Sequence, residues 1–271
     1  MHVNFVLDAS GLEALCTAAG LGEASVLIEK LEPSGRVAAR TTLRPAGAFY
    51  PASMIKLPIA MVLATLCNSG ARAWSDRFVV ARANLTTNDA PSPFVAGYRA
   101  TLEELTHAML AASDNVATNV LVDVIGRERL TQACRELGLR ETTVARKLSG
   151  SLPLIDDPAA TGRNVHPAEE CAALLRLLAR DRGTTWTVVV RALEAQIWND
   201  KLSRGLSPGD SFAHKTGDTD EVSHDGGILT LPDGTRFIII VYTALPSDAT
   251  TDARFAAFMR ALRPHLAKNT R

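Results

Sequence analysis

The spacing of apolar residues predicts β-strands near both ends of the chain. Some segments alternate apolar and polar residues, which is typical of half-buried strands, and others are short continuous apolar runs, which are typical of fully buried strands. The predicted strands are residues 25–32, 36–43, 211–217, 223–231 and 236–245. Turns between neighbouring pairs are supplied by Pro33-Ser34-Gly35 and Pro232-Asp233-Gly234. A β-hairpin is therefore expected near each end.

Apolar residues recur every three or four positions through most of the remaining chain, which predicts helices. Ser10 and Glu13 match a capping box. Thr101 and Glu104 match a second one, and Gly138 marks the end of a helix. The predicted helices begin at Ser10 and Ser53 and, beyond these, cover residues 101–112, 115–125, 127–137, 167–180, 185–197 and 251–267.

The order of these elements predicts an α/β (α+β) fold in which both termini share one antiparallel sheet. Residues 1–50 and 184–271 would form this sheet domain, flanked by the N- and C-terminal helices. Residues 51–183, including a loop at 146–166, would form an all-α insertion domain. Such an arrangement leaves a cleft between the two domains, and clefts at domain boundaries commonly bind small molecules. The chemistry is expected in that cleft.

Composition and charge exclude several classes of protein. The chain has 271 residues, of which 46% are hydrophobic and 21% charged, as in a soluble enzyme. Its 29 basic side chains equal its 29 acidic ones, so no net field attracts nucleic acid or anionic lipid. The longest apolar run, Leu57–Cys67, is shorter than the roughly 20 residues that span a bilayer. Neither a nucleic acid nor a membrane is expected as a partner.

The N-terminus and the cysteines bear on the cellular compartment. The N-terminal stretch MHVNFVLDASGLEAL lacks the basic region and the long apolar core of a secretory signal. We expect an intracellular protein, or an exported one (periplasmic or secreted) if a leader has been removed. No C-x-x-C pair occurs among Cys16, Cys67, Cys134 and Cys171, so all four are expected to be free and to pack as small apolar side chains.

A serine and a lysine stand together where a predicted helix begins. Ser53 and Lys56 are three residues apart, so a helix would hold the hydroxyl and the ammonium on one face. The helix start would offer N–H groups and a positive dipole end to an oxygen that gains negative charge. Lys56 could act as a base if burial or a nearby cation kept it neutral. Ser53 is a candidate nucleophile, although the pattern alone also fits a simple helix cap.

Two further motifs carry polar groups to the same expected cleft. Ser113-Asp114-Asn115 falls between two predicted helices, where it would present a hydroxyl and a carboxamide. Lys215-Thr216-Gly217 lies on a predicted strand and offers a fixed positive charge, a hydroxyl donor for a carboxylate, and a glycine that lets a ligand approach the backbone. Each motif also has an ordinary structural interpretation, as a helix cap or an edge strand. Their joint occurrence in this order argues against coincidence.

In this order the motifs S-x-x-K, S-D-N and K-T-G resemble the signature set of class A β-lactamases and the related penicillin-binding proteins. The resemblance extends over nearly the whole chain. It implies a β-lactamase-like fold, a serine acyl-enzyme mechanism and, as the activity, hydrolysis of β-lactam amides, which confers antibiotic resistance. By this resemblance Ser53 would be the acylated nucleophile and Lys56 the group that activates it. Ser113 would relay the proton to the leaving nitrogen, and Asn115 would help to hold the lysine and a substrate amide.

The resemblance also implies a binding subsite and an oxyanion hole. Lys215 and Thr216 would bind the substrate carboxylate, with Gly217 beside them. The backbone N–H groups of Ser53 and Asp218 would form the oxyanion hole. Each of these roles is an expectation that follows from the family's motifs.

The chain departs from the family in one loop. Class A β-lactamases carry, on an irregular loop after the S-D-N helices, a glutamate that activates the water which hydrolyses the acyl-enzyme. No glutamate occurs here between Glu141 and Glu169, and the only carboxylate side chains in the loop at 146–166 are those of Asp156 and Asp157. A general base must reach its water, and aspartate is one methylene shorter. Three outcomes remain open: deacylation by one of these aspartates, a stalled acyl-enzyme as in penicillin-binding proteins, or hydrolysis of an activated ester.

A second departure lies after the third motif. His224 falls near where some β-lactamases place an arginine that steadies the substrate carboxylate, so it would bind substrate or act as an acid/base. The alternative is a structural histidine that is hydrogen-bonded to Asp225. The other five histidines are scattered without metal-ligand spacing, so no metal and no cofactor are expected. The expected partner is a small molecule (a β-lactam, a peptide or an ester), and we expect a monomer.

Overall fold

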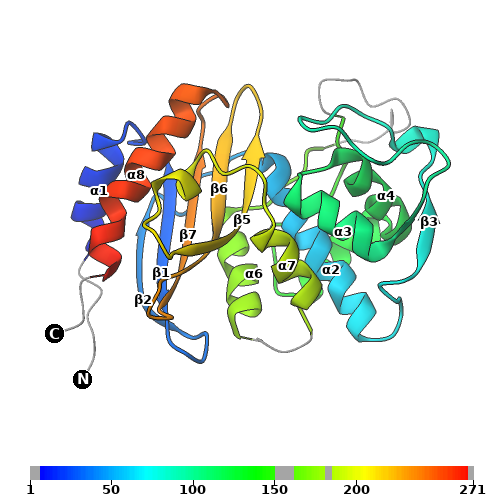
Figure 1. The fold of residues 1–271 in the computed structure, drawn as a ribbon, viewed down its shortest axis with the longest axis horizontal. Helices are drawn as coiled ribbons and strands as arrows, with labels where there is room; N and C mark the ends of the chain where they lie inside the picture. Colours follow the sequence, from blue (N-terminus) through cyan, green and yellow to red (C-terminus); the bar gives the residue numbers. More distant parts are fainter. Residues whose placement is uncertain (1–6, 150–161, 181–184, 268–271) are drawn as a thin grey trace. The chain divides into compact units, whose positions relative to one another are not determined.

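The computed structural model describes residues 7–149, 162–180 and 185–267 (Figure 1). Contacts divide the chain into two compact units. The first, called here the sheet unit, consists of Met1–Met54, Pro167–Arg180 and Trp198–Arg271. The second, called the helical unit, consists of Ile55–His166 and Asp181–Ile197.

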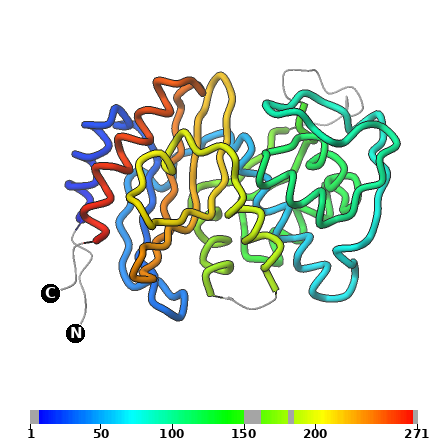
Figure 2. The backbone as a smooth tube through the Cα atoms, in the orientation of Figure 1, coloured from blue at the N-terminus to red at the C-terminus, as the bar shows by residue number. Residues whose placement is uncertain are grey.

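Both ends of the chain contribute strands to one antiparallel sheet, so the predicted fold class is confirmed. The sheet order is β2-β1-β7-β6-β5. Its strands are β1 (Ser25–Leu31), β2 (Val37–Leu43), β5 (Ser211–Asp218), β6 (Ser223–Thr230) and β7 (Arg236–Thr243). The N-terminal β1 and the C-terminal β7 run side by side (Figure 2), with Ser25 opposite Tyr242 and Leu31 opposite Arg236. β5, which carries the Lys215-Thr216-Gly217 motif, is an edge strand.

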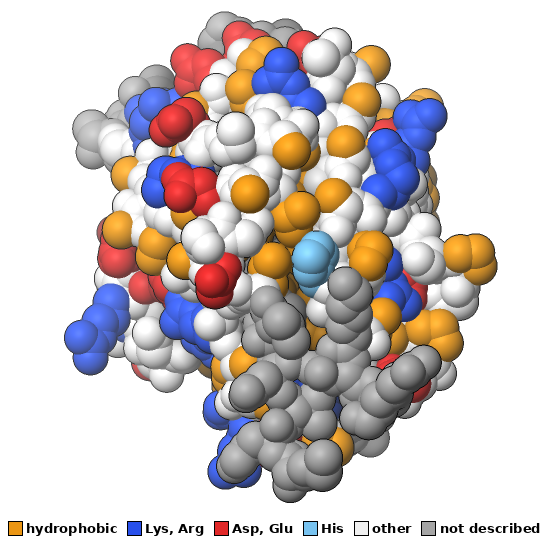
Figure 3. All heavy atoms as spheres, turned by 90° about the vertical axis from the view of Figure 1, so that its left-hand side faces the viewer, with side chains coloured by type: hydrophobic (Ala, Val, Ile, Leu, Met, Phe, Trp, Pro, Cys, Tyr) orange, Lys and Arg blue, Asp and Glu red, His pale blue; other side chains and the backbone are white. Residues whose placement is uncertain are grey.

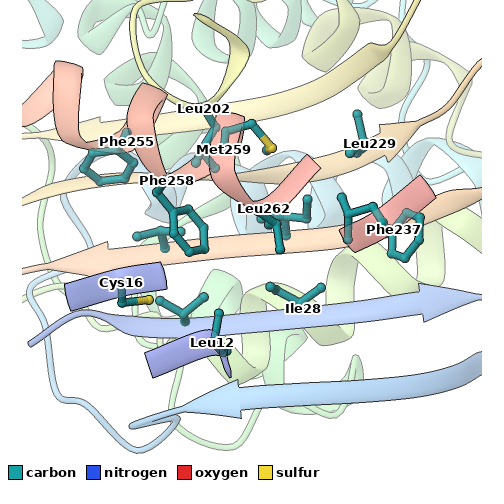
Figure 4. Packing of buried hydrophobic residues seen from close by; sticks show 14 of the residues in the cluster. Leu12, Cys16, Ile28, Leu202, Leu229, Phe237, Phe255, Phe258, Met259 and Leu262 are labelled. Carbon is teal, nitrogen blue, oxygen red and sulfur yellow. The ribbon is translucent and has the colours of Figure 1, made fainter. Parts of the chain in front are cut away.

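One face of the sheet is covered by the helices from the two ends of the chain. These are α1 (Ala9–Ala18) and α8 (Ala249–Ala267), together with the short 3-10 helix η3 (Leu202–Gly205). Alternate residues of β7 point into the apolar layer between helices and sheet, as the two-residue period of a strand requires. Figure 4 shows this cluster, which includes Leu12, Cys16, Ile28, Leu202, Leu229, Phe237, Phe255, Phe258, Met259 and Leu262.

The helix α6 (Ala168–Arg180) belongs to the sheet unit, although the sequence pattern suggested that residues 51–183 form a separate domain. It packs against β7 and β1. Arg176 of α6 donates to the buried carboxylate of Glu29 on β1 at 2.6 Å. An amphipathic pattern shows that a helix buries one face, but it does not say which element covers that face.

The helical unit contains most of the remaining helices and a small sheet. Its helices are α2 (Lys56–Asn68), η2 (Arg82–Asn84), α3 (Leu102–Ala111), α4 (Asn115–Ile125), α5 (Arg127–Glu136) and α7 (Thr187–Glu194). The strands β3 (Arg77–Val79) and β4 (Arg99–Thr101) pair antiparallel, so this unit is not all-α as predicted. Three-residue strands are too short to produce a readable alternation in the sequence.

Several smaller expectations can be compared with the structure. The helix α1 is capped by Asp8, whose carboxylate accepts from the N–H of Gly11, and not by Ser10. All four cysteines are free, as predicted. Among the described residues, no helix combines the length and the apolar character needed to cross a membrane. Basic and acidic side chains are interspersed on the face shown in Figure 3, in keeping with the zero net charge.

Candidate active site

Lys56, the first residue of α2, is fully buried in the helical unit and is surrounded by oxygen atoms. Its Nζ lies 2.5 Å from the backbone oxygen of Ser113, 3.0 Å from Ser113 Oγ and 2.8 Å from Asn115 Oδ1. An ammonium group can donate to all three oxygens. A neutral amine can instead donate to the two carbonyl-type oxygens and accept the hydroxyl proton of Ser113. The same geometry therefore suits a group that gains and loses a proton.

The Ser113-Asp114-Asn115 motif divides its tasks between capping and site chemistry. Asp114 is the N-cap of α4, with Oδ1 accepting from Ala117 N at 2.8 Å. The capping role therefore falls to the middle residue, and the side chains on either side of it both reach Lys56. Ser113 has a φ of 58°, a left-handed conformation that is costly for a residue with a Cβ. Backbone strain of this kind concentrates at functional positions.

Asn115 is fixed by contacts that the sequence did not reveal. Its Nδ2 donates to Thr87 O at 2.9 Å, and its backbone N–H donates to Asn88 Oδ1 at 2.5 Å. With the amide nitrogen engaged in this way, Oδ1 is left facing Lys56. Thr87 and Asn88 lie in an irregular stretch without a recognisable motif.

Ser53 lies in the 3-10 helix η1 (Ala52–Ile55), which leads directly into α2. The three-residue spacing to Lys56 is therefore kept along a helical segment. Ser53 is partly exposed, whereas its neighbours Ala52 and Met54 are buried. Ala52 has a φ of 46°, so a strained residue precedes this serine as well.

In the sheet unit, the Lys215-Thr216-Gly217 motif packs against the segment that carries Ser53. A Cβ added to Gly217 would lie 3.0 Å from Met54 Cγ, 3.0 Å from Pro51 O and 3.2 Å from Met54 N. The space beside this glycine is thus filled by the chain itself. The structure thus adds a packing reason for this glycine: without a Cβ, β5 can approach the turn before Met54 and neither segment has to shift.

The two residues before this glycine are buried at the edge of the sheet. Lys215 is fully buried, Thr216 is 3% exposed, and Lys215 Nζ donates to Thr216 O at 2.8 Å. Because β5 is an edge strand of the sheet that the described residues form, one side of its backbone makes no ladder hydrogen bonds with another described strand. Such an edge can bind a substrate through N–H and C=O groups, as the expected use of the Asp218 N–H requires.

His224 is placed differently from the prediction. It is fully buried, its Nε2 lies 2.8 Å from Tyr50 O, and its ring stacks on Tyr242 with centroids 4.2 Å apart. Burial lowers its pKa from 6.5 to about 4, although its backbone partners oppose the shift. A buried, neutral ring bound to the backbone of the segment before Ser53 fits a structural role, and we do not assign it to the substrate.

The structural alternative for His224 named the wrong partner. Asp225 binds His214, with Oδ1 at 2.7 Å from His214 Nδ1. Consecutive strand residues point to opposite faces of the sheet, so His224 and Asp225 cannot share one face. The buried pair of Asp225 and His214 escaped the sequence analysis because its members lie on different strands.

Asp156 and Asp157, the candidate deacylation residues, lie outside the described residues. The described segments on either side of them pair through an isolated antiparallel β-bridge between Thr143 and Val165. Asn164 Oδ1 accepts from the N–H groups of Ala145 and Arg146 at 2.8 and 2.9 Å.

Comparisons with known proteins bear on the fold and on the family of the chain. Among solved structures, PBP-A superposes with a TM-score of 0.82 at 20% identity, covering 97% of this chain and 98% of that one. A mutant of PBP-A described as an acyl-enzyme complex with penicillin G gives the same values. A β-lactamase from Sphaerobacter thermophilus has a TM-score of 0.77 at 26% identity and covers 96% of this chain and 98% of that one. An ancestral class A β-lactamase has a TM-score of 0.79 at 23% identity and covers 94% and 98%.

The sequence comparisons give one match and one negative result. A search of curated proteins finds no match. The Beta-lactamase enzyme family matches residues 10–262, which include all three motifs and every predicted site residue. The chain belongs to the β-lactamase enzyme family.

Proposed function

We propose that the protein is a serine hydrolase that is acylated on Ser53 and hydrolyses β-lactam amides. The observation that carries this proposal is the buried Lys56, whose Nζ is held by Ser113 and Asn115 three residues after the partly exposed serine. A simple helix cap at Ser53 would give no reason to bury a lysine side chain beside the oxygens of a strained serine.

In the proposed acylation, the Ser53 oxygen attacks the lactam carbonyl carbon as its proton passes to Lys56. The carbonyl oxygen becomes negative and is stabilised by the backbone N–H groups of Ser53 and Asp218. The carbon–nitrogen bond then breaks, and the nitrogen takes a proton from Ser113, which regains one from Lys56. Lys56 is thereby returned to its starting state, and the acyl group remains on Ser53 as an ester.

The substrate carboxylate is assigned to Lys215 and Thr216. Because the Lys215 side chain is fully buried, it has little freedom to change its conformation. The Thr216 hydroxyl adds a second hydrogen-bond donor for the carboxylate. A carboxylate that binds there exchanges hydration for charge-assisted hydrogen bonds.

The second candidate function is that of a penicillin-binding DD-peptidase-like protein, which is acylated and deacylates slowly. It is favoured by one observation, the absence of glutamate between Glu141 and Glu169. Under the first proposal, Asp156 or Asp157 would activate the deacylating water; under the second, nothing in this loop does so.

The test mixes the protein with a chromogenic cephalosporin and, separately, with a fluorescent penicillin. Absorbance follows turnover, and mass spectrometry of the intact protein and its peptides locates the adduct. Steady turnover that Ser53→Ala abolishes supports β-lactam hydrolysis, whereas a lasting adduct on Ser53 without turnover supports the second function. Ser34→Ala, in the exposed turn between β1 and β2, is the matched control and should behave as the wild type.

A third outcome would contradict both candidates. If Ser53 forms no adduct with either compound, while the protein cleaves a nitrophenyl ester in a Ser53-dependent manner, the enzyme is an esterase on the same fold. Loss of turnover in Ser34→Ala would show that the serine substitutions act through folding.

A further inference from the structure

A buried lysine lies beside the residue that follows the Lys215-Thr216-Gly217 motif. Lys201, just before η3, is 4% exposed. Its Nζ forms an ion pair with Asp218 Oδ1 and donates to His224 O at 3.2 Å. The same Nζ lies 5.6 Å from the centroid of the Phe255 ring of α8. No sequence motif marked this lysine.

Lys201 does not have the freedom of a surface lysine, because its chain segment is attached to β5 and β6. The N–H of Leu202 donates to Asp225 Oδ2 at 3.1 Å, and Ser203 Oγ lies 3.0 Å from His214 Nε2. Both of these partner side chains belong to the buried pair of His214 and Asp225. The chain that follows the lysine is thus fixed to the strands that carry and adjoin the motif.

Asp218 places a carboxylate at a sensitive position. Its side chain is 28% exposed, and Ser223 Oγ donates to the same Oδ1 at 3.0 Å. Its neighbour Gly217 lies against Met54, one residue after the proposed nucleophile. In the proposed function the Asp218 N–H faces an oxygen that becomes negative. An uncompensated carboxylate on that same residue would oppose this charge, since two charges a few ångströms apart repel strongly near a protein surface.

We propose that Lys201 is a positioning residue, which neutralises the Asp218 carboxylate and holds the end of β5 so that negative charge can develop at Ser53. The inference rests on the proposed function. Lys201 touches neither the substrate nor the reacting atoms; it acts through Asp218.

A second carboxylate provides an internal control. Asp252 of α8 also interacts electrostatically with Lys201, and burial raises the pKa of its carboxyl. Asp252 lies on a helix and is not part of the motif-bearing strand. If Lys201 serves mainly to balance buried charge, removing either aspartate should compensate for its loss. If it serves the reaction, only removal of the Asp218 charge should do so.

The experiment measures the second-order rate constant for modification of Ser53, using a fluorescent penicillin and a fluorophosphonate probe. The fluorophosphonate reacts with activated serines irrespective of substrate: the serine oxygen attacks phosphorus and fluoride leaves. Lys201→Met should slow both reactions by at least about tenfold. Lys201→Arg keeps the charge and should stay within about threefold of the wild type.

Double variants separate the explanations. Lys201→Met with Asp218→Asn should return to within about threefold of the wild type, whereas Lys201→Met with Asp252→Asn should remain about tenfold slow. If the Asp218 double variant stays as slow as Lys201→Met, or if Lys201→Met is as fast as the wild type, the proposal is overturned. Should Lys201→Met not fold, Lys201→Gln takes its place in the single and double variants, because glutamine removes the charge and keeps a hydrogen-bond donor, and the same outcomes decide.

The two probes keep this test distinct from that of the proposed function. If the fluorophosphonate modifies wild-type Ser53 and penicillin does not, the proposal that β-lactams are the substrates is wrong. The rate constants for the fluorophosphonate would then still test the proposed role of Lys201. If neither probe modifies Ser53, both the proposed function and this inference are wrong.

Discussion

At the scale of single residues, two strained positions stand out next to the proposed chemistry. Ala52 and Ser113 have φ values of 46° and 58°, and they adjoin or belong to the S-x-x-K and S-D-N motifs. Neither is glycine, so each conformation costs about 1–2 kcal/mol, which surrounding contacts must offset. At Ser113, the hydroxyl near Lys56 gives a reason to keep a side chain in spite of this cost.

Comparing two substitutions at Ser113 separates strain from chemistry. Ser113→Ala and Ser113→Gly both remove the hydroxyl, so each should slow acylation of Ser53 by roughly a hundredfold or more. The glycine variant should have the higher free energy of unfolding, by about 1 kcal/mol, because glycine adopts a positive φ without penalty. Urea unfolding and penicillin labelling measure the two effects. An alanine variant at least as stable as the glycine variant would argue against strain at this position.

Gly217 provides a second test at this scale. Gly217→Ala would place a Cβ 3.0 Å from Met54 Cγ and from Pro51 O, and the backbone oxygen cannot easily move. We expect a loss of about 1–3 kcal/mol of stability and a fall in Ser53 labelling, because the turn before Met54 must shift. Gly22→Ala, where the nearest atom is 3.9 Å away, is the control and should leave both unchanged. Equal effects at the two positions would contradict the packing explanation for Gly217.

At the scale of elements, the contact between η3 and α8 depends on one small residue. A Cβ on Gly205 would meet the backbone oxygen of Ala256 and would come within 2.6 Å of Met259 Cβ. We expect Gly205→Ala to push η3 away from α8 and to lower stability by about 2 kcal/mol. Because Lys201 precedes η3, labelling of Ser53 should slow as well.

Thermal and urea unfolding of Gly205→Ala, with Gly22→Ala as reference, measure the loss of stability. Penicillin labelling measures the slower acylation of Ser53. An unchanged melting temperature would show that α8 moves to accommodate the added Cβ without a loss of stability, and it would contradict this prediction.

Which elements the sequence could predict follows from their length and partners. α4 and β7 carry long apolar patterns and were predicted close to their observed bounds. β3 and β4 have three residues each, too few to show a period. The assignment of α6 to the sheet depends on packing against β7, a long-range contact that its own pattern does not contain.

At the scale of the whole molecule, His224 predicts how folding stability varies with pH. Burial lowers the pKa of its ring to about 4 in the folded state, against an ordinary value of 6.5, with Lys201 adding to and Asp218 opposing the shift. The unfolded chain therefore binds this proton first as the pH falls. The histidine costs no stability above pH 6.5, and about 3 kcal/mol is lost progressively as the pH falls from 6.5 to 4.

His224→Phe removes the titrating group and keeps a ring against Tyr242. The drop in unfolding free energy between pH 7 and about pH 4.5 should be smaller in the variant than in the wild type, by about 2 kcal/mol. Urea unfolding at the two pH values measures this difference. The same drop in both proteins would mean that His224 titrates normally when folded.

The candidate site was predictable where it lies within local motifs. The contacts of Lys56 with Ser113 and Asn115 join residues far apart in the chain, and the sequence indicates them only through the resemblance of the motifs to the β-lactamase family. The role of Lys201 depends on Asp218, a residue on another element, and no local pattern indicates such a pairing. For His224, the two-residue period of a strand is by itself enough to exclude Asp225 as a partner, because adjacent strand residues point to opposite faces.

The sheet order also has a consequence for synthesis of the protein. β1 lies between β2 and β7, so its apolar residues Val26, Leu27 and Ile28 gain their second neighbour only after β7 leaves the ribosome. Until then the N-terminal hairpin is marginal on its own and carries an unpaired edge. Closing such a distant pair is slow because it has a high contact order. A nascent chain that is interrupted before β7 would thus expose an aggregation-prone strand. We expect such a chain to be bound by chaperones or degraded by proteases, whereas a chain that includes β7 can complete the sheet.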